Sequence, residues 1–269
     1  MAVQLEFDTK PKLVLAVQDS LVMIRRSTTH IVRHTDQLLG TFFQPIMFLV
    51  LFSAVFGGAI SGSLPKGVSY LNFLMAGIIV QTVAFGSTTT AVAITADLQK
   101  GIVDRFRSLP MSNLAVLNGH VVSDLFRNGI STIVMILAGL AIGFRTNASF
   151  TDWLMITGIL VLFTLAFSWL SAIVGVFAKS IEGVQWLSFV FVFPLTFASA
   201  AFVRADTITP IIRPFAENQP ITQVVEAVRA LMLGTPIGNH GWLAVAWSLG
   251  ILAIAMPTAS WLFRRKTMQ

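Results

Sequence analysis

The sequence of 269 residues contains no cysteine, a single tyrosine and few charged residues, which make up 11% of the chain. Without cysteine the chain can form no disulfide, no thiolate metal site and no cysteine nucleophile. A soluble domain carries about 25% charged residues, so this chain has too few charges to cover its surface in water. The composition is instead 55% hydrophobic, with a mean hydropathy of +0.79. These values indicate an integral membrane protein.

Motifs for nucleotide binding, hydrolysis and metal binding are also missing. The sequence has no G-x-x-x-x-G-K-[ST] phosphate loop, and the dipeptide Gly-Lys never occurs. No serine lies in a G-x-S-x-G motif. His30 and His34 have the i, i+4 spacing of a metal pair, but the glutamate of H-E-x-x-H and a third ligand are missing. We therefore expect no catalytic residue, no metal and no cofactor in this chain, which is not itself an enzyme.

Six apolar runs are long enough to cross a membrane, which requires about 20 residues. They cover approximately Leu38–Ile60, Tyr70–Thr95, Val116–Phe144, Trp153–Ala178, Val184–Val203 and Trp242–Phe263. No signal peptide precedes them, because the first run lacks a small-residue cleavage site. The sequence predicts an all-α, polytopic membrane protein with six transmembrane helices.

The distribution of basic residues predicts the orientation. The N-terminal 37 residues, the loops 96–115 and 179–183 and the C-terminus together carry twelve Lys and Arg, whereas the opposite loops carry five. Positive charge is enriched in cytoplasmic loops, so we expect both termini of this multi-pass protein in the cytosol. The formal net charge of +6 is explained in this way, without nucleic acid as a partner.

Two further segments have helical patterns outside the six runs. Residues 11–27 are amphipathic and predict a helix lying in the cytoplasmic interface, within a cytosolic N-terminus of residues 1–37. Residues 38–269 then form the transmembrane domain. Thr222–Leu233 follows Pro220 and stops at Gly234, which predicts a short helix. Its apolar face requires an apolar neighbour, so we expect residues 204–235 to form a re-entrant helix pair on the outer side.

The loop Ala96–Ser112 contains charged residues with apolar residues between them, and Pro110 is expected to end any helix within it one or two residues earlier. A short helix with an apolar ridge and mixed charges suits docking to a soluble partner. A solvated turn whose basic residues only follow the positive-inside bias is the alternative.

The run from Asp97 to Arg127 (DLQKGIVDRFRSLPMSNLAVLNGHVVSDLFR) resembles the region between spans two and three of type-2 ABC exporter permeases. The likeness is greatest to the daunorubicin-resistance-type drug and lipid efflux branch. Asn218–Gly234 is similar to an outer "N-P-hydroxyl … R-x-L-x-x-G" segment of the family, with Gln219 inserted.

This resemblance implies a permease subunit of an ATP-binding-cassette exporter that moves a drug, antibiotic or lipid outward and confers drug resistance. ATP and Mg would be bound by a separate ATPase subunit, and two permeases, as a homodimer, would join two ATPases in a 2:2 complex. The segment 96–112 would be the coupling helix, with a smaller second contact in the turn after span four. The implied coupling residues are Lys100, Asp104, Arg105, Phe106, Arg107, Leu109 and Glu182.

Asp124 and Arg127 are three residues apart in span three and share a helix face. They form either a polar contact that transmits motion or an interfacial pair in which Arg127 reaches the lipid headgroups.

Polar and aromatic side chains within the spans are candidates for a substrate path. Polar groups in a membrane tend to face a cavity, whereas Ser and Thr can instead bond to their own helix backbone. Aromatic stripes can carry a hydrophobic substrate or simply pack between helices. The candidates are Gln44, Phe48, Phe52, Gln81, Phe189, Phe193 and Phe197.

An ion- or proton-coupled secondary transporter or channel is the second hypothesis. Proton coupling needs ionisable groups buried at mid-membrane. The charged residues here are expected near helix ends or in loops, which favours the ATP-driven exporter.

Overall fold

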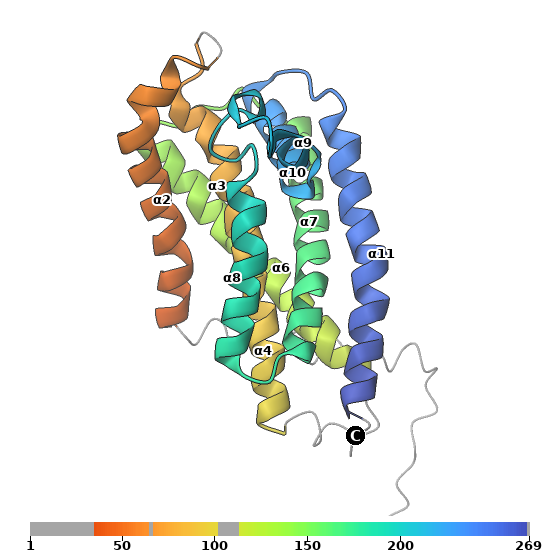
Figure 1. Cartoon of the computed structure of the whole chain (residues 1–269). Coiled ribbons are helices and arrows are strands. Elements are labelled where there is room, and N and C mark those ends of the chain that lie inside the picture. The colour runs from red at the N-terminus through yellow and green to blue at the C-terminus, as the bar shows by residue number, and fades with distance from the viewer. Residues whose placement is uncertain (1–34, 65–66, 102–112, 268–269) are drawn as a thin grey trace, which may run out of the picture.

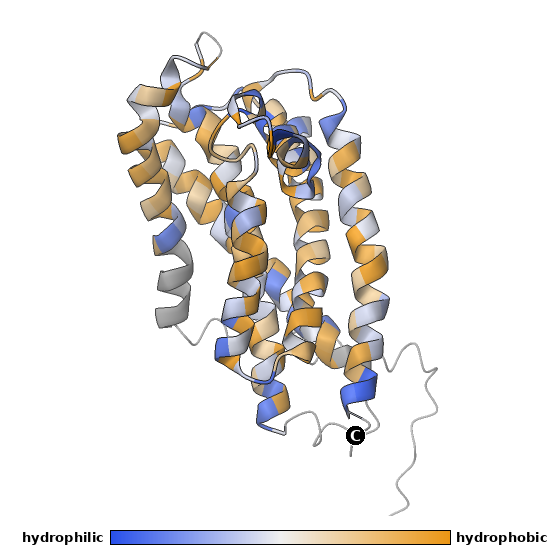
Figure 2. Cartoon of the chain, in the orientation of Figure 1, coloured by the Kyte–Doolittle hydropathy of each residue, from blue (hydrophilic) through white to orange (hydrophobic). Residues whose placement is uncertain are grey.

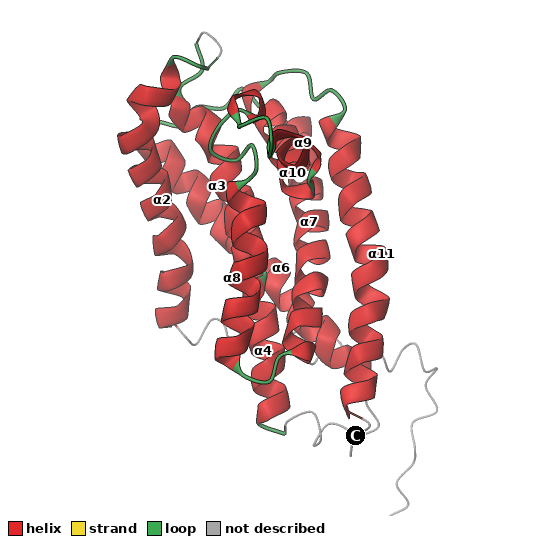
Figure 3. Cartoon of the chain, viewed as in Figure 1, coloured by secondary structure: helices red, strands yellow, loops and turns green. Residues whose placement is uncertain are grey.

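The computed structural model describes residues 35–64, 67–101 and 113–267. Figure 3 shows these residues as helices joined by loops, without a strand among them. The long helices are α2 (Thr35–Ser61), α6 (Asn113–Ile142), α7 (Phe150–Phe177) and α11 (His240–Thr267). The shorter ones are α3 (Tyr70–Gly86), α4 (Thr88–Gln99), α8 (Ile181–Phe197), η1 (Ala205–Thr207), α9 (Arg213–Asn218) and α10 (Pro220–Leu233).

Five candidate membrane spans are present in the described chain. They are Phe43–Ser61, Tyr70–Gln99, Val116–Ile142, Phe150–Phe177 and His240–Thr267. The chain is therefore an all-α polytopic membrane protein, as expected. Ile181–Phe197 is apolar but shorter, at 17 residues. Figure 2 shows apolar residues along the middle of the helices and hydrophilic residues toward the ends of α4 and α11.

Helix α3 lies at the centre of the packing. Most of its 17 residues are buried, because α2, α6 and α10 pack around it. Gly77 lets α3 approach the chain after α8, since a Cβ there would collide with the carbonyl group of Ala201. The most extensive contact between two helices of the described chain is that of α7 with α11. By contrast, only 6% of the apolar part of α2 (Phe43–Ser61) is buried, so α2 contacts the rest of the described bundle along one side only.

The second predicted span is confirmed as the candidate span Tyr70–Gln99. It consists of two helices, α3 and α4, with a turn at Ser87 between them. The fifth predicted span also differs, because α8 ends at Phe197 and not at Val203. The carbonyl groups that follow α8 accept hydrogen bonds from Gln219 and Arg229, which hold this segment in a non-helical turn.

The short helix predicted between the last two spans is confirmed as α10. It begins at Pro220, where proline is favoured, and Gly234 follows its end with φ +69°, a left-handed conformation suited to glycine. Its apolar face, including Val224, Val228 and Met232, is fully buried. In Figure 1, α10 lies across the direction of the long helices, near the start of α11.

Candidate functional site

Polar contacts between helices gather at three levels, and the first is the end where α4 stops and α8 begins. The Gln99 side chain donates to the carbonyl O of Lys179 at 3.0 Å. Thr95 Oγ1 donates to Gly175 O at 2.7 Å, and a Cβ at Gly175 would lie 2.6 Å from Ala91 O. The start of the predicted coupling segment is thus joined to the turn after α7.

The same end also carries exposed charges. Lys100, Lys179 and Glu182 are exposed there, and Lys266 donates to the carbonyl groups of Val176 and Ala178 at the end of α7. The remaining predicted coupling residues lie outside the described residues. They are Asp104, Arg105, Phe106, Arg107 and Leu109. Their role, like that of residues 11–27, stays a prediction.

Asp97 and His120 form a second contact at this end. Nε2 of His120 lies 3.0 Å from Oδ2 of Asp97, and both side chains are nearly buried. The pair joins α4 to α6, the two helices between which residues 102–112 run. Sequence reasoning did not pair the two residues, because nothing in the spacing of Asp97 and His120 marks them as neighbours.

The second level lies at the interruption between α3 and α4. The Thr90 amide donates to Ser87 O at 3.1 Å, an i→i+3 bond of 3₁₀ type. Hydroxyl groups bond to the backbone around this turn: Ser87 Oγ to Val83 O, Thr88 Oγ1 to Phe85 O and Thr89 Oγ1 to Gly86 O, at 2.9, 2.7 and 2.9 Å. Gly-Ser pairs and hydroxyl back-bonding are recognised causes of helix bends.

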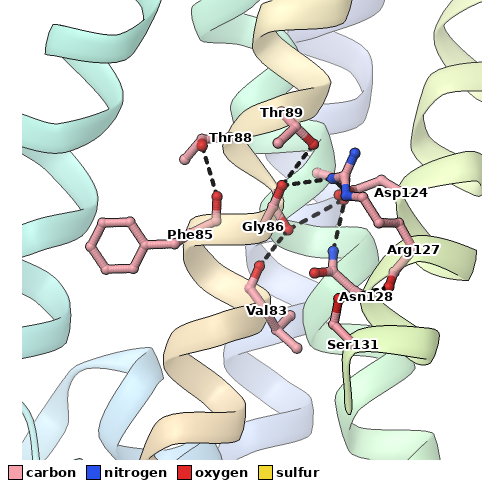
Figure 4. Close-up of polar contacts among 11 residues, drawn as sticks. Val83, Phe85, Gly86, Thr88, Thr89, Asp124, Arg127, Asn128 and Ser131 are labelled. Atoms are coloured by element: carbon pink, nitrogen blue, oxygen red, sulfur yellow. Dashed lines mark hydrogen bonds and ion pairs between the residues drawn. The ribbon is translucent and has the colours of Figure 1, made fainter. Parts of the chain in front are cut away.

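Asp124 is the centre of this level. It is 1% exposed and accepts hydrogen bonds from Arg127, from Ser168 of α7 and, at 3.1 Å, from Asn128. Arg127 also donates to Gly86 O at 2.7 Å. Figure 4 shows Arg127 and Asn128 beside Gly86. We call Asp124, Arg127, Asn128, Ser168 and the Gly86 carbonyl the buried network; it connects α3, α6 and α7.

The buried network corrects two expectations. Arg127 does not reach toward headgroups, because its guanidinium group is turned inward onto Gly86 O and its side chain is only 12% exposed. Asp124 also lies well inside the bundle: it is the twelfth residue of α6, about 16 Å along the helix from its first residue. An ion pair away from the helix ends therefore exists in this protein, contrary to the expectation from the sequence.

The third level is centred on Arg229 of α10, which is 4% exposed. Its guanidinium group donates to Phe73 O, Ala200 O and Ala201 O at 3.0, 2.7 and 3.3 Å, pairs with Glu226 at 2.7 Å and stacks over the Phe73 ring. One side chain thus ties α10 to α3 and to the chain after α8. The sequence places Arg229 in the family-like segment Asn218–Gly234 but does not predict its contacts, because most of its partners are backbone groups that no sequence pattern reveals.

Aromatic side chains of α8 and α2 form one continuous row. Ring contacts run along α8 from Trp186 through Phe189, Phe193 and Phe197, pass to Phe202, and continue to Phe52 of α2. Phe48 and Phe56 contact Phe52. The α8 residues of this row are exposed on the surface of the single chain.

The two predicted polar path residues lie in different surroundings. Gln44 is exposed on α2, whereas Gln81 is 3% exposed in the centre of α3, with no partner for its Oε1 atom in the described structure. Thr82, near Gln81, donates to the backbone O of Ile78 at 2.7 Å. The structure therefore does not bring Gln44 and Gln81 together.

A bundle of long apolar helices, with polar side chains buried between some of them, defines a polytopic helical membrane protein. Residues 18–233 match the ABC-2 type transporter family. Daunorubicin resistance ABC transporter permease protein DrrB1 of Streptomyces coeruleorubidus is 30% identical over 96% of this chain and 90% of its own length. Probable doxorubicin resistance ABC transporter permease protein DrrC of Mycobacterium tuberculosis is 24% identical over 91% of this chain and 88% of its own length. Putative transport permease ycf38 of Porphyra purpurea is 24% identical over 86% of this chain and 80% of its own length.

The chain belongs to the ABC-2 type transporter family. It is the permease subunit of an ABC exporter, homologous to drug-resistance exporters, and the matched domain is a transmembrane one and not a nucleotide-binding one. Membership implies association with an ATPase subunit. The hypothesis of an ion-coupled secondary transporter is therefore not retained, despite the buried Asp124.

Proposed function

We propose that this permease exports a hydrophobic or amphipathic compound from the cytoplasm or the inner leaflet, driven by ATP and Mg bound to a separate ATPase subunit. Relatives named for daunorubicin and doxorubicin resistance support a drug of that kind as substrate. The row of aromatic rings on α8 and α2 supports the same chemistry, because flat apolar rings stack on aromatic side chains.

The contact between Gln99 and Lys179 carries the proposed coupling mechanism. The segment 96–112 and the turn with Glu182 were predicted separately as contacts for the ATPase. Gln99 Nε2 joins these two segments at 3.0 Å, so a partner that docks at one pushes on both. The exposed Lys100, Lys179 and Glu182 supply charges for such a docking surface.

Six crossings with both termini in the cytosol fit the arrangement of the helices. In Figure 1, α8 runs alongside α3 and α7, from the end of the bundle where α7 stops toward the end where α9 and α10 lie. Its 17 residues span about 26 Å. The end of α11 carries Arg264, Arg265 and Lys266, in agreement with a cytosolic C-terminus. At the opposite end, α9 and α10 form the proposed re-entrant pair, and residues 1–37 form the proposed cytosolic N-terminal segment.

A second copy of the permease is the proposed partner in the membrane, giving two permeases and two ATPases. The first helix supports this proposal, because so little of α2 is buried within one chain.

Co-expression with its partner phosphate-loop ATPase tests the proposal. The permease alone should hydrolyse no ATP, whereas the purified complex should contain two copies of each subunit by native mass spectrometry. Reconstituted vesicles should take up daunorubicin only with ATP. Arg105→Ala and Phe106→Ala should lower both activities, while Arg145→Ala, at the opposite end of the bundle, should not.

Normal transport by both the Arg105 and Phe106 variants would show that the coupling segment is assigned wrongly. A complex that hydrolyses ATP but moves neither daunorubicin nor fluorescent phospholipid would refute the substrate class.

A further inference from the structure

The three levels of polar contacts divide the bundle into two connected ends and a middle. At one end Asp97, Thr95 and Gln99 tie α4 to α6 and α7. At the other end Arg229 ties α10 to α3 and to the chain after α8. Between them, the described residues connect α3, α6 and α7 through the buried network. The buried network is therefore the level at which polar side chains connect these three helices between the two ends.

The backbone is interrupted at this same level. Because the Thr90 amide bonds to Ser87 O, the Gly86 carbonyl group is available to side chains, and it accepts from Arg127 of α6 at 2.7 Å and from Thr89 Oγ1 of α4 at 2.9 Å. The neighbouring Asn128 packs directly on Gly86, where a Cβ would collide with its carboxamide oxygen. Arg127 thus touches the one turn where α3 can change direction relative to α4.

We propose that Arg127 is a positioning residue of the transport cycle, which fixes the bend between α3 and α4 by holding the Gly86 carbonyl while it is paired with Asp124. Movement of α4, driven by the ATPase, changes this bend and breaks the Arg127–Gly86 contact. The inference rests on the proposed function in one respect, namely that force enters at the end of α4.

Buried polar atoms without partners mark the same level. They include Arg127 Nε and Asn128 Oδ1 of the buried network, Thr90 Oγ1 of α4, and Ser123 Oγ. Ser123 lies three and four residues from His120 and Arg127 and therefore shares their side of α6. Buried polar groups are normally paired, so these atoms can accept or donate a further hydrogen bond if the proposed change of the bend brings a partner to them.

The first test compares transported daunorubicin per ATP hydrolysed in the reconstituted complex. Arg127→Gln should lower this ratio at least fivefold while ATP hydrolysis stays within twofold of wild type. Arg127→Lys should restore part of the ratio, because lysine can pair with Asp124 but lacks the planar fork that also reaches Gly86 O. Arg145→Gln is the matched control, since Arg145 bonds to carbonyl groups at the exposed outer end.

A double variant separates positioning from simple charge compensation. Asp124→Asn with Arg127→Gln leaves no unpaired charge in the bundle, but the Gly86 carbonyl has lost its guanidinium donor. We expect the double variant to fold, by size-exclusion chromatography, and still to transport at least fivefold less per ATP. Recovery to within twofold of wild type would overturn the proposal and reduce the pair to a structural role.

A third measurement does not depend on the substrate. The chain has no cysteine, so Ser123→Cys introduces a single thiol beside the buried network. Maleimide should label this thiol at least tenfold faster in the vanadate-trapped complex than without nucleotide, and Arg127→Gln should raise the resting rate. Equal rates in all three states would refute movement at this level, whereas failure of daunorubicin transport alone would refute only the proposed substrate.

Discussion

Replacement of Arg229 by methionine should strongly destabilise the outer end of the bundle. Removing one partner of a buried ion pair costs about 3–5 kcal/mol. The three hydrogen bonds to Phe73 O, Ala200 O and Ala201 O give about 3 kcal/mol, at about 1 kcal/mol each. We therefore expect a loss of about 3 kcal/mol, at the lower end of this range, because Glu226, at 26% exposure, can reach solvent once its partner is gone.

The free energy of unfolding in SDS, followed by tryptophan fluorescence, measures this loss. Arg229→Lys should retain only part of the stability, because one ammonium group cannot contact three carbonyl groups in the geometry of the guanidinium fork. Arg213→Met is the control: it removes an exposed ion pair with Glu217 on the adjacent α9 and should have little effect. If Arg229→Met loses less than about 1 kcal/mol, the assignment of Arg229 as the main tie of α10 is wrong.

Three other predictions concern packing at Gly77, the stability supplied by the Asp97–His120 contact, and topology. Gly77→Val should abolish accumulation of the folded protein in membranes because its side chain collides with backbone, whereas Gly158→Val, at an open position, should accumulate normally on immunoblots. His120→Leu removes a hydrogen bond to a carboxylate and should cost about 1.5–3 kcal/mol in the SDS assay; an unchanged stability would argue against the pair. A single cysteine at Lys100 should react with impermeant maleimide only after cells are permeabilised, while one at Thr209 should react in intact cells; the reverse pattern would invert the topology.

The helical architecture could be predicted from the sequence because hydrophobic length and helix stop signals are local. The runs at 38–60, 153–178 and 242–263 correspond to α2, α7 and α11, and Pro220 and Gly234 bound α10 as expected. The turn at Ser87 between α3 and α4 was not predicted, because the residues around it are all tolerated within a membrane helix. Only the bonding of successive hydroxyl groups to the backbone shows the interruption.

The buried contacts could not be predicted, because their partners are distant in sequence. Asp124 and Arg127 were recognised as a pair from their spacing, but the Gly86 carbonyl and Ser168 came only from the packing of α3 and α7. Of the two alternatives for Arg127, contact with lipid headgroups could not be excluded from the sequence, because the backbone acceptor at Gly86 comes from another helix. The coupling residues 104–109 remain predictions from family likeness.

The length of α8 bears on the lipid that surrounds it. A helix of about 26 Å is shorter than the hydrocarbon core of about 30 Å, and a short span is accommodated by local thinning of the bilayer. If α8 crosses the membrane, acyl chains beside its exposed phenylalanines are compressed and disordered. A flat apolar molecule dissolved in the leaflet would meet least resistance there, so thicker membranes should slow its entry into the exporter.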